Sequence, residues 1–209
     1  MSAFEDQPVV GLFGTCGDST FRQDLFIPEY ERLGVDYFNP QVDDWKPELA
    51  DIESDHLAHD VVQCWPVLGS TYGTGSLAEQ GYSIASSLRA PTPLPKFVIP
   101  YIEMDLSEQL TDEVAFKESI RARKLASTHL ANNASPNVFV VSSLDEMLET
   151  SITLFGVAKS LVELGRSNNP AYRRFVEGRS KQEAFARAME SGQLGAAAAT
   201  LAARRGQSS

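Results

Sequence analysis

The sequence predicts a three-layer α/β sandwich, in which helices cover both faces of a mainly parallel sheet of five strands. Two observations support this fold class. Short apolar segments alternate along the chain with longer segments of helical periodicity, and the apolar segments are continuous instead of alternating with polar residues. Continuous apolar strands are covered on both faces, which is typical of parallel sheets joined by right-handed helical crossovers.

The segments expected to form strands are rich in β-branched and aromatic residues. They are residues 8–14, 35–39, 60–65, 96–101 and 137–141. Helices are expected over residues 19–33, 76–88, 111–127 and 143–164. Pro28 is expected to kink or divide the first helix, because proline has no amide hydrogen to donate. In the second helix, leucine, isoleucine and alanine form one stripe, while Glu79 and Tyr82 lie on another.

The chain of 209 residues is expected to form one α/β domain, residues 1–165, with a C-terminal helical tail, residues 166–209. Residues 167–170 interrupt the pattern, and residues 181–205 are alanine-rich. The tail has too few apolar side chains for a core of its own. It is expected to pack on the body, to pack on a partner subunit or to remain mobile.

Composition excludes several classes of partner. The net charge of −10 gives no basic surface for a nucleic-acid polymer, and no segment approaches the roughly 20 apolar residues that span a membrane. The first seven residues do not resemble a signal peptide, and Cys16 and Cys64 form no disulfide framework. We therefore expect a cytoplasmic protein. No cofactor and no metal are expected, because the three histidines show no metal-binding spacing.

Ligands of open parallel sheets bind beyond the carboxyl ends of the strands, where three loops of this chain are expected to meet. The loop of residues 14–19 matches neither a P-loop nor a dinucleotide-binding motif. In the second loop, residues 38–45, Asn39 and Asp44 can bond sugar hydroxyls, and Trp45 offers a stacking face for a base. The alternative for this loop is an ordinary surface turn. The third loop, residues 66–75, leads to Glu79.

Glu79 is expected in the first turn of a helix that follows a glycine-rich loop. The positive end of the helix dipole would keep this carboxylate ionised, and an ionised carboxylate can attack a sugar carbon. The alternative is a capping box, in which Glu79 returns a hydrogen bond to the backbone of Ser76. A second carboxylate is expected from the acidic stretch that contains Glu53 and Asp55, although such stretches are usually solvated helix faces.

Three stretches together resemble the nucleoside 2-deoxyribosyltransferase-like family. They are residues 10–17 (VGLFGTCG), residues 38–45 (FNPQVDDW) and residues 75–82 (GSLAEQGY). The resemblance covers roughly residues 8–102 and extends to about Leu148. It implies a flavodoxin-like fold, usually in a homo-oligomer, that acts on a nucleoside or nucleotide. In the family, a glutamate at the position of Glu79 attacks the anomeric carbon and forms a glycosyl–enzyme intermediate.

The residues that the resemblance and the loops assign to the substrate are Gly14, Thr15, Cys16, Asn39, Asp44, Trp45, Gly75 and Ser76. The chain departs from the family pattern at Gly73, where classical members carry a sugar-binding aspartate, and at Leu12, where they carry tyrosine. A base-associated aspartate of the family falls near Glu53 or Asp55. These departures leave two rivals to an enzyme: a nucleotide-binding module without catalysis, and an interaction protein that assembles through its tail.

Overall fold

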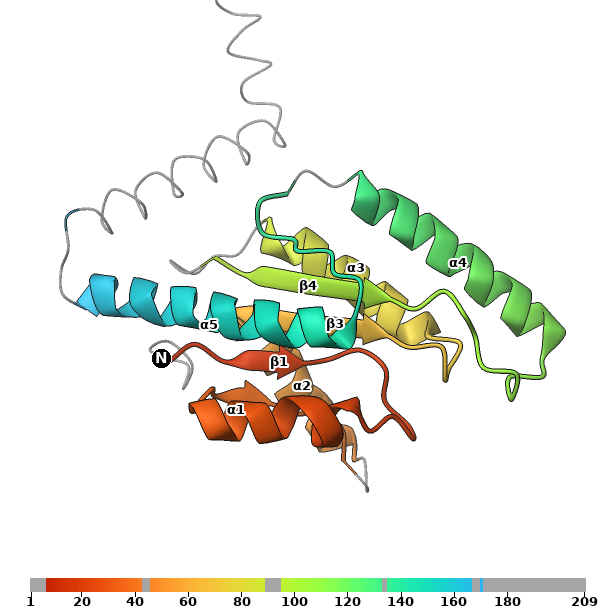
Figure 1. The fold of residues 1–209 in the computed structure, drawn as a ribbon, viewed down its shortest axis with the longest axis horizontal. Helices are drawn as coiled ribbons and strands as arrows, with labels where there is room; N and C mark the ends of the chain where they lie inside the picture. The colour runs from red at the N-terminus through yellow and green to blue at the C-terminus, as the bar shows by residue number, and fades with distance from the viewer. Residues whose placement is uncertain (1–6, 43–45, 89–94, 133–134, 167–169, 171–209) are drawn as a thin grey trace, which may run out of the picture. The chain divides into compact units, whose positions relative to one another are not determined.

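The computed structural model describes residues 7–42, 46–88, 95–132, 135–166 and 170. It forms two compact units, residues 1–163 and 164–209. The first unit contains the sheet and its helices (Figure 1). Most of the predicted tail, residues 167–169 and 171–209, lies outside the described residues.

Within the described residues, the sheet contains four parallel strands in the order β2-β1-β3-β4. They are β1 (Val10–Leu12), β2 (Tyr37–Phe38), β3 (Val62–Val67) and β4 (Phe97–Ile102). The register pairs Val10 with Tyr37 on one side and with Val62 on the other. Four of the predicted strands are thus confirmed. Strand β1 lies between β2 and β3, so the next two strands of the chain pair with β1 on opposite sides.

The predicted fifth strand is wrong among the described residues. Val138 forms an isolated parallel bridge with Val98, where the amide of Val98 donates to Asn137 and the amide of Phe139 donates to Val98. The next donor on that edge of β4 would be Pro100, which has no N–H group. The carbonyl of Pro100 still accepts from Val141, but the ladder cannot continue in both directions.

The helices of the described residues follow the prediction with one addition. They are η1 (Arg22–Phe26), α1 (Ile27–Leu33), α2 (Pro47–His59), α3 (Thr74–Ser87), α4 (Glu113–Ala131) and α5 (Leu144–Arg166). The predicted division near Pro28 is confirmed, because a π-helical segment, η1, precedes α1 and the amide of Ile27 donates to the carbonyl of Arg22. The acidic stretch around Glu53 extends to a complete helix, α2, of 13 residues.

Among the described residues, two groups of buried side chains pack against the sheet, one on each face. Alternate residues of the strands, including Leu12 and Cys64, pack against η1, α1 and α5. The intervening residues Phe13 and Trp65 stack on one another, with ring centroids 5.0 Å apart, and pack against α2 and α3. This arrangement confirms the α/β sandwich. No helix among the described residues has the length and apolar character needed to cross a membrane.

The face that α3 turns toward the sheet differs from the expected apolar stripe. Its buried residues are Gln80, Ser83 and Ser87, whereas Leu88 is 61% exposed. The reason lies in β3, which presents the fully buried Gln63 to this helix. Ser83 donates to the Gln63 side chain, and Gln80 donates to the carbonyl of Trp65 at 3.1 Å. A polar strand residue therefore selects polar helix partners, because a buried amide must be hydrogen-bonded.

Candidate functional site

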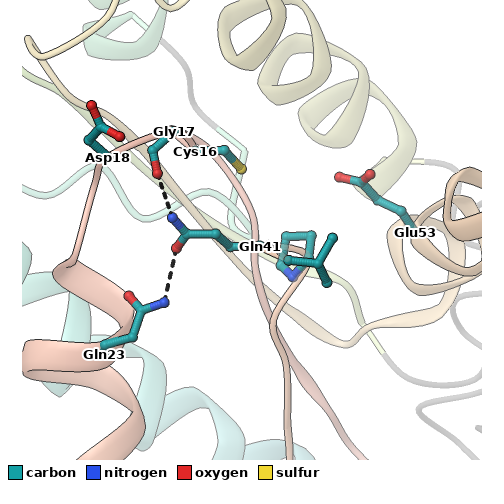
Figure 2. Close-up of a pocket in the computed structure, with 8 residues that line it drawn as sticks. Cys16, Gly17, Asp18, Gln23, Gln41 and Glu53 are labelled. Carbon is teal, nitrogen blue, oxygen red and sulfur yellow. Dashed lines mark hydrogen bonds between the residues drawn. The ribbon is translucent and has the colours of Figure 1, made fainter. Parts of the chain in front are cut away.

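A pocket of about 480 Å³ lies at the carboxyl ends of β1 and β2 (Figure 2). Its lining comes from the loop after β1, the start of η1, the segment after β2, and α2. The lining residues are Cys16, Gly17, Asp18, Gln23, Pro40, Gln41, Val42 and Glu53. Figure 2 shows Glu53 on the side opposite to Asp18 and Gln23. The pocket is thus at the edge where parallel sheets bind ligands.

The loop after β1 is fixed to β3 by its first two residues. Gly14 has a φ of +86°, and a Cβ atom there would lie 2.4 Å from the carbonyl oxygen of Pro66. Thr15 is buried; its amide donates to Pro66 at 2.9 Å, and its Oγ1 accepts from the amide of Leu68 at 2.8 Å. Of the three loop residues predicted to bind substrate, Cys16 lines the pocket, while Gly14 and Thr15 hold the loop.

Arg22 holds the same loop from beneath. Its guanidinium is fully buried and donates to the carbonyls of Leu12, Phe13 and Thr15, each at 2.8 Å. Burial lowers the pKa of Arg22, and the neighbouring Cys16 opposes this shift. The carbonyl groups that it binds are seven to ten residues away, so no local motif reveals the interaction.

Gln41 connects the loops after β1 and β2. Its Nε2 donates to the carbonyls of Gly17 at 2.7 Å and Ser19 at 3.1 Å, and its Oε1 accepts from Gln23 at 3.1 Å (Figure 2). Asn39, a predicted substrate ligand, accepts a hydrogen bond from the amide of Gln41 at 3.0 Å instead of lining the pocket. Sequence reasoning missed Gln41 and Gln23, because a glutamine in a loop carries no signal of its partner.

The predicted partners Asp44 and Trp45 lie outside the described residues. Asp55 does not line the pocket; its carboxylate oxygen lies 3.0 Å from Nδ1 of His59, one turn along α2. Of the two acidic candidates on this helix, Glu53 therefore lies at the pocket. Burial raises the pKa of Glu53, and the positive charge of Arg22 acts in the opposite direction.

The start of α3 corrects two expectations about Glu79. The helix begins at Thr74, its N-cap is Gly73, and no side chain caps it. Ser76 is consequently inside the first turn, Glu79 lies in the second turn, and the capping box is wrong. The helix starts early because Gly73 adopts a left-handed conformation, with a φ of +68°, which turns the chain directly into the helix.

The electrostatic expectation for Glu79 also reverses. Its pKa is raised, first by partial desolvation and then by the charge of Glu53, whereas the sequence predicted a carboxylate that the helix start keeps ionised. The Glu79 side chain is exposed and does not belong to the pocket lining, but it lies near enough to Glu53 for the two charges to interact. Gly75 and Ser76, the predicted substrate ligands at this helix start, do not line the pocket either.

Gly73 occupies the position at which the resembled family carries an aspartate. A Cβ atom here would lie 2.7 Å from Cγ1 of Val67 and 2.8 Å from Nη2 of Arg123. Arg123 is buried and donates to the carbonyls of Val67, Leu68, Thr71 and Glu103. This guanidinium therefore takes the space next to Gly73, and the backbone conformation there disfavours any residue with a side chain.

No group of three or more histidine, cysteine or acidic side chains in the described part of the chain is arranged to hold a metal ion. Comparison with protein-family models, with curated proteins and with solved structures finds no match to this chain. The functional argument therefore depends on the pocket and on the two glutamates beside it.

Proposed function

We propose that this protein cleaves or transfers the N-glycosidic bond of a nucleoside or nucleotide, with Glu79 as nucleophile and Glu53 as the second carboxylate. One observation carries the proposal. Glu53 of α2 lines a pocket at the carboxyl edge of a parallel sheet, and its charge reaches Glu79 of α3, which lies outside that lining. The resemblance of residues 75–82 to the family segment adds the identity of the nucleophile.

Two displacements would make up the reaction. A carboxylate oxygen of Glu79 attacks the anomeric carbon, the C–N bond breaks, and its electron pair leaves with the base. The second base or water then attacks the same carbon and releases Glu79. The raised pKa of Glu79 makes its carboxylate a stronger nucleophile when ionised. An ionised Glu53 would stabilise the positive charge that develops on the sugar.

The pocket supports a small ligand of this kind. Its volume of about 480 Å³ falls within the range of about 300–1,000 Å³ that is usual for small-molecule sites. The carboxylate of Asp18 and the amide of Gln23 are polar groups that can bond sugar hydroxyls, and Val42 and Pro40 add apolar surface.

The test is incubation with a pool of nucleosides and 5′-monophosphates, with a second free base, followed by mass analysis of the products. We expect Glu79→Gln to abolish release of base and Glu53→Gln to slow it about 100-fold or more. Glu48→Gln, an exposed acid on the same helix as Glu53, is the control and should leave the rate unchanged. Full turnover by Glu79→Gln would remove the proposed nucleophile.

A second candidate is a module on the same fold that binds nucleotides without catalysis. One observation favours it: Glu79 is not among the residues that line the pocket. The resemblance adds that Gly73 stands where the family carries a sugar-binding aspartate. This candidate predicts that ligands raise the melting temperature while chromatography detects no free base. Detection of free base that depends on Glu79 would contradict it.

We also propose that the protein is a cytoplasmic homo-oligomer. Sedimentation equilibrium of the full chain and of a chain that ends at Gly165 would measure the assembly and the contribution of the tail. A monomeric full-length protein would contradict the proposal.

A further inference from the structure

The charged side chains that line the pocket are all acidic. Among the eight described residues that line it, Asp18 and Glu53 are acidic and none is lysine, arginine or histidine. Glu79, whose pKa responds to the charge of Glu53, adds a third carboxylate nearby. A ligand in this pocket therefore meets negative charge, and the net charge of −10 for the whole chain does not offset it.

The nearest buried cation cannot supply an anion site. Arg22 is fully buried, and its Nε, Nη1 and Nη2 donate to the carbonyls of Leu12, Thr15 and Phe13. The guanidinium also lies 3.8 Å from the Sγ of Cys16, through Nη2, and 4.4 Å from the centroid of the Phe21 ring, through Cζ. The guanidinium is thus held behind the loop backbone and presents no group to a phosphate in the pocket. It acts at a distance, by favouring the ionised form of Glu53.

We infer that the pocket selects N-glycosides whose base carries a fixed positive charge and whose sugar carries no phosphate, such as pyridinium or N-alkylated purine ribosides. The inference rests on the proposed function and narrows its substrate class. A cationic base is attracted by Asp18 and Glu53, whereas a 5′-phosphate is repelled by the same carboxylates.

The chemistry of the leaving group agrees with this choice. When the base is neutral, the electron pair of the C–N bond leaves an anion unless an acid protonates the base. When the base is cationic, the same electron pair neutralises it, and the base departs uncharged without a proton. The new bond joins C1′ to a carboxylate oxygen of Glu79. In the second step water attacks C1′, frees the Glu79 carboxylate and gives its proton to Glu53.

The experiment measures binding to the Glu79→Gln variant, in which turnover is blocked, by titration calorimetry at pH 7.5. The probes are nicotinamide riboside, its uncharged 1,4-dihydro form and nicotinamide mononucleotide, which adds the 5′-phosphate. We expect the cationic riboside to bind about tenfold or more tightly than either of the others, with a preference that shrinks as salt is raised.

Removing the pocket charges tests the cause. Glu53→Gln and Asp18→Asn should each reduce the preference for the cationic riboside at least threefold, while Glu48→Gln should leave it unchanged. Thermal melting of each variant shows that it is folded. Equal binding of the charged and uncharged ribosides, tighter binding of the mononucleotide, or no binding of any probe would overturn the inference.

Turnover by the wild-type protein separates this inference from the proposed function. If the cationic riboside binds preferentially but no probe or nucleoside releases its base, the proposed function fails and the charge selectivity stands. If neutral nucleosides or 5′-monophosphates are cleaved with a higher kcat/KM than cationic ribosides, relative to their uncatalysed rates, the function stands and the charge selectivity fails.

Discussion

Gly73 permits a direct test of how the structure is built at the start of α3. Gly73 and Gly34 have nearly the same backbone conformation, with φ values of +68° and +66°. Their surroundings differ, because a Cβ atom at Gly34 meets nothing within 4 Å, whereas at Gly73 it lies 2.7 Å from Val67 and 2.8 Å from Arg123. Substitution of each by alanine therefore separates backbone strain from steric overlap.

The two costs follow from these contacts. A residue with a Cβ atom in the left-handed region costs about 1 kcal/mol, and both substitutions incur this cost. Overpacking of a buried site adds about 1–3 kcal/mol, which applies to Gly73 alone. Val67 is fully buried and Arg123 is held by carbonyl groups, so neither neighbour moves easily. We expect Gly34→Ala to lower the free energy of unfolding by about 1 kcal/mol and Gly73→Ala by about 2–4 kcal/mol.

Urea denaturation at constant pH measures both values, and the m-value should stay constant so that the midpoints report stability. Equal losses for the two variants would refute the steric part of the argument. A loss below about 0.5 kcal/mol at Gly34 would refute the backbone part.

Two further predictions concern buried cations. Arg123→Met leaves several carbonyl groups without their donor and should lower the free energy of unfolding by about 3 kcal/mol or more. Arg121→Met, at an exposed position of the same helix, is the control and should change it by less than about 0.5 kcal/mol. Urea denaturation of both variants measures the two changes. Burial lowers the pKa of Lys96 from 10.5 to about 8. Between pH 8 and pH 10.5 the unfolded chain therefore binds more protons at this lysine than the folded chain does. The free energy of unfolding should consequently rise by about 3 kcal/mol across this pH range. Comparison with Lys96→Met isolates this contribution, and identical pH profiles of the two proteins would contradict it.

The strands could be predicted from the sequence where their own side chains are apolar or β-branched. Apolar and aromatic residues predicted the positions of β1 to β4, and β1 and β3 are buried along their whole length. The failure of residues 137–141 to extend the sheet depends on Pro100 of the neighbouring strand, and strand pairing is not visible in either segment alone. The polar inner face of α3 has the same origin, since Gln63 of β3 decides what the helix must offer.

The site was predictable in its position but not in its composition. The rule that ligands bind at the carboxyl ends of parallel strands led to the loops after β1 and β2, and Cys16 and Glu53 do line the pocket. Gln41 and Arg22 donate to main-chain carbonyl groups that the fold brings close to them. Every residue type carries the same carbonyl group, so the sequence does not show which carbonyl groups will be the partners. Glu79 was misplaced within α3 because Ser76 imitates a helix cap, while the true start, Gly73, has no side chain to signal it.

The hydrogen-bond partners of the two buried arginines affect the charge state of Glu53 and Glu79. Arg22 and Arg123 are both buried, and each is bound by main-chain carbonyls instead of a carboxylate. Among the described residues, neither Glu53 nor Glu79 forms an ion pair with an arginine or lysine, so burial and mutual repulsion raise the pKa of Glu79 without a paired cation to lower it. An ion-paired carboxylate would be a weaker nucleophile, because its charge would already be compensated. Because carbonyl groups hold the Arg22 guanidinium, this cation lowers the pKa of Glu53 through its charge and forms no ion pair with it.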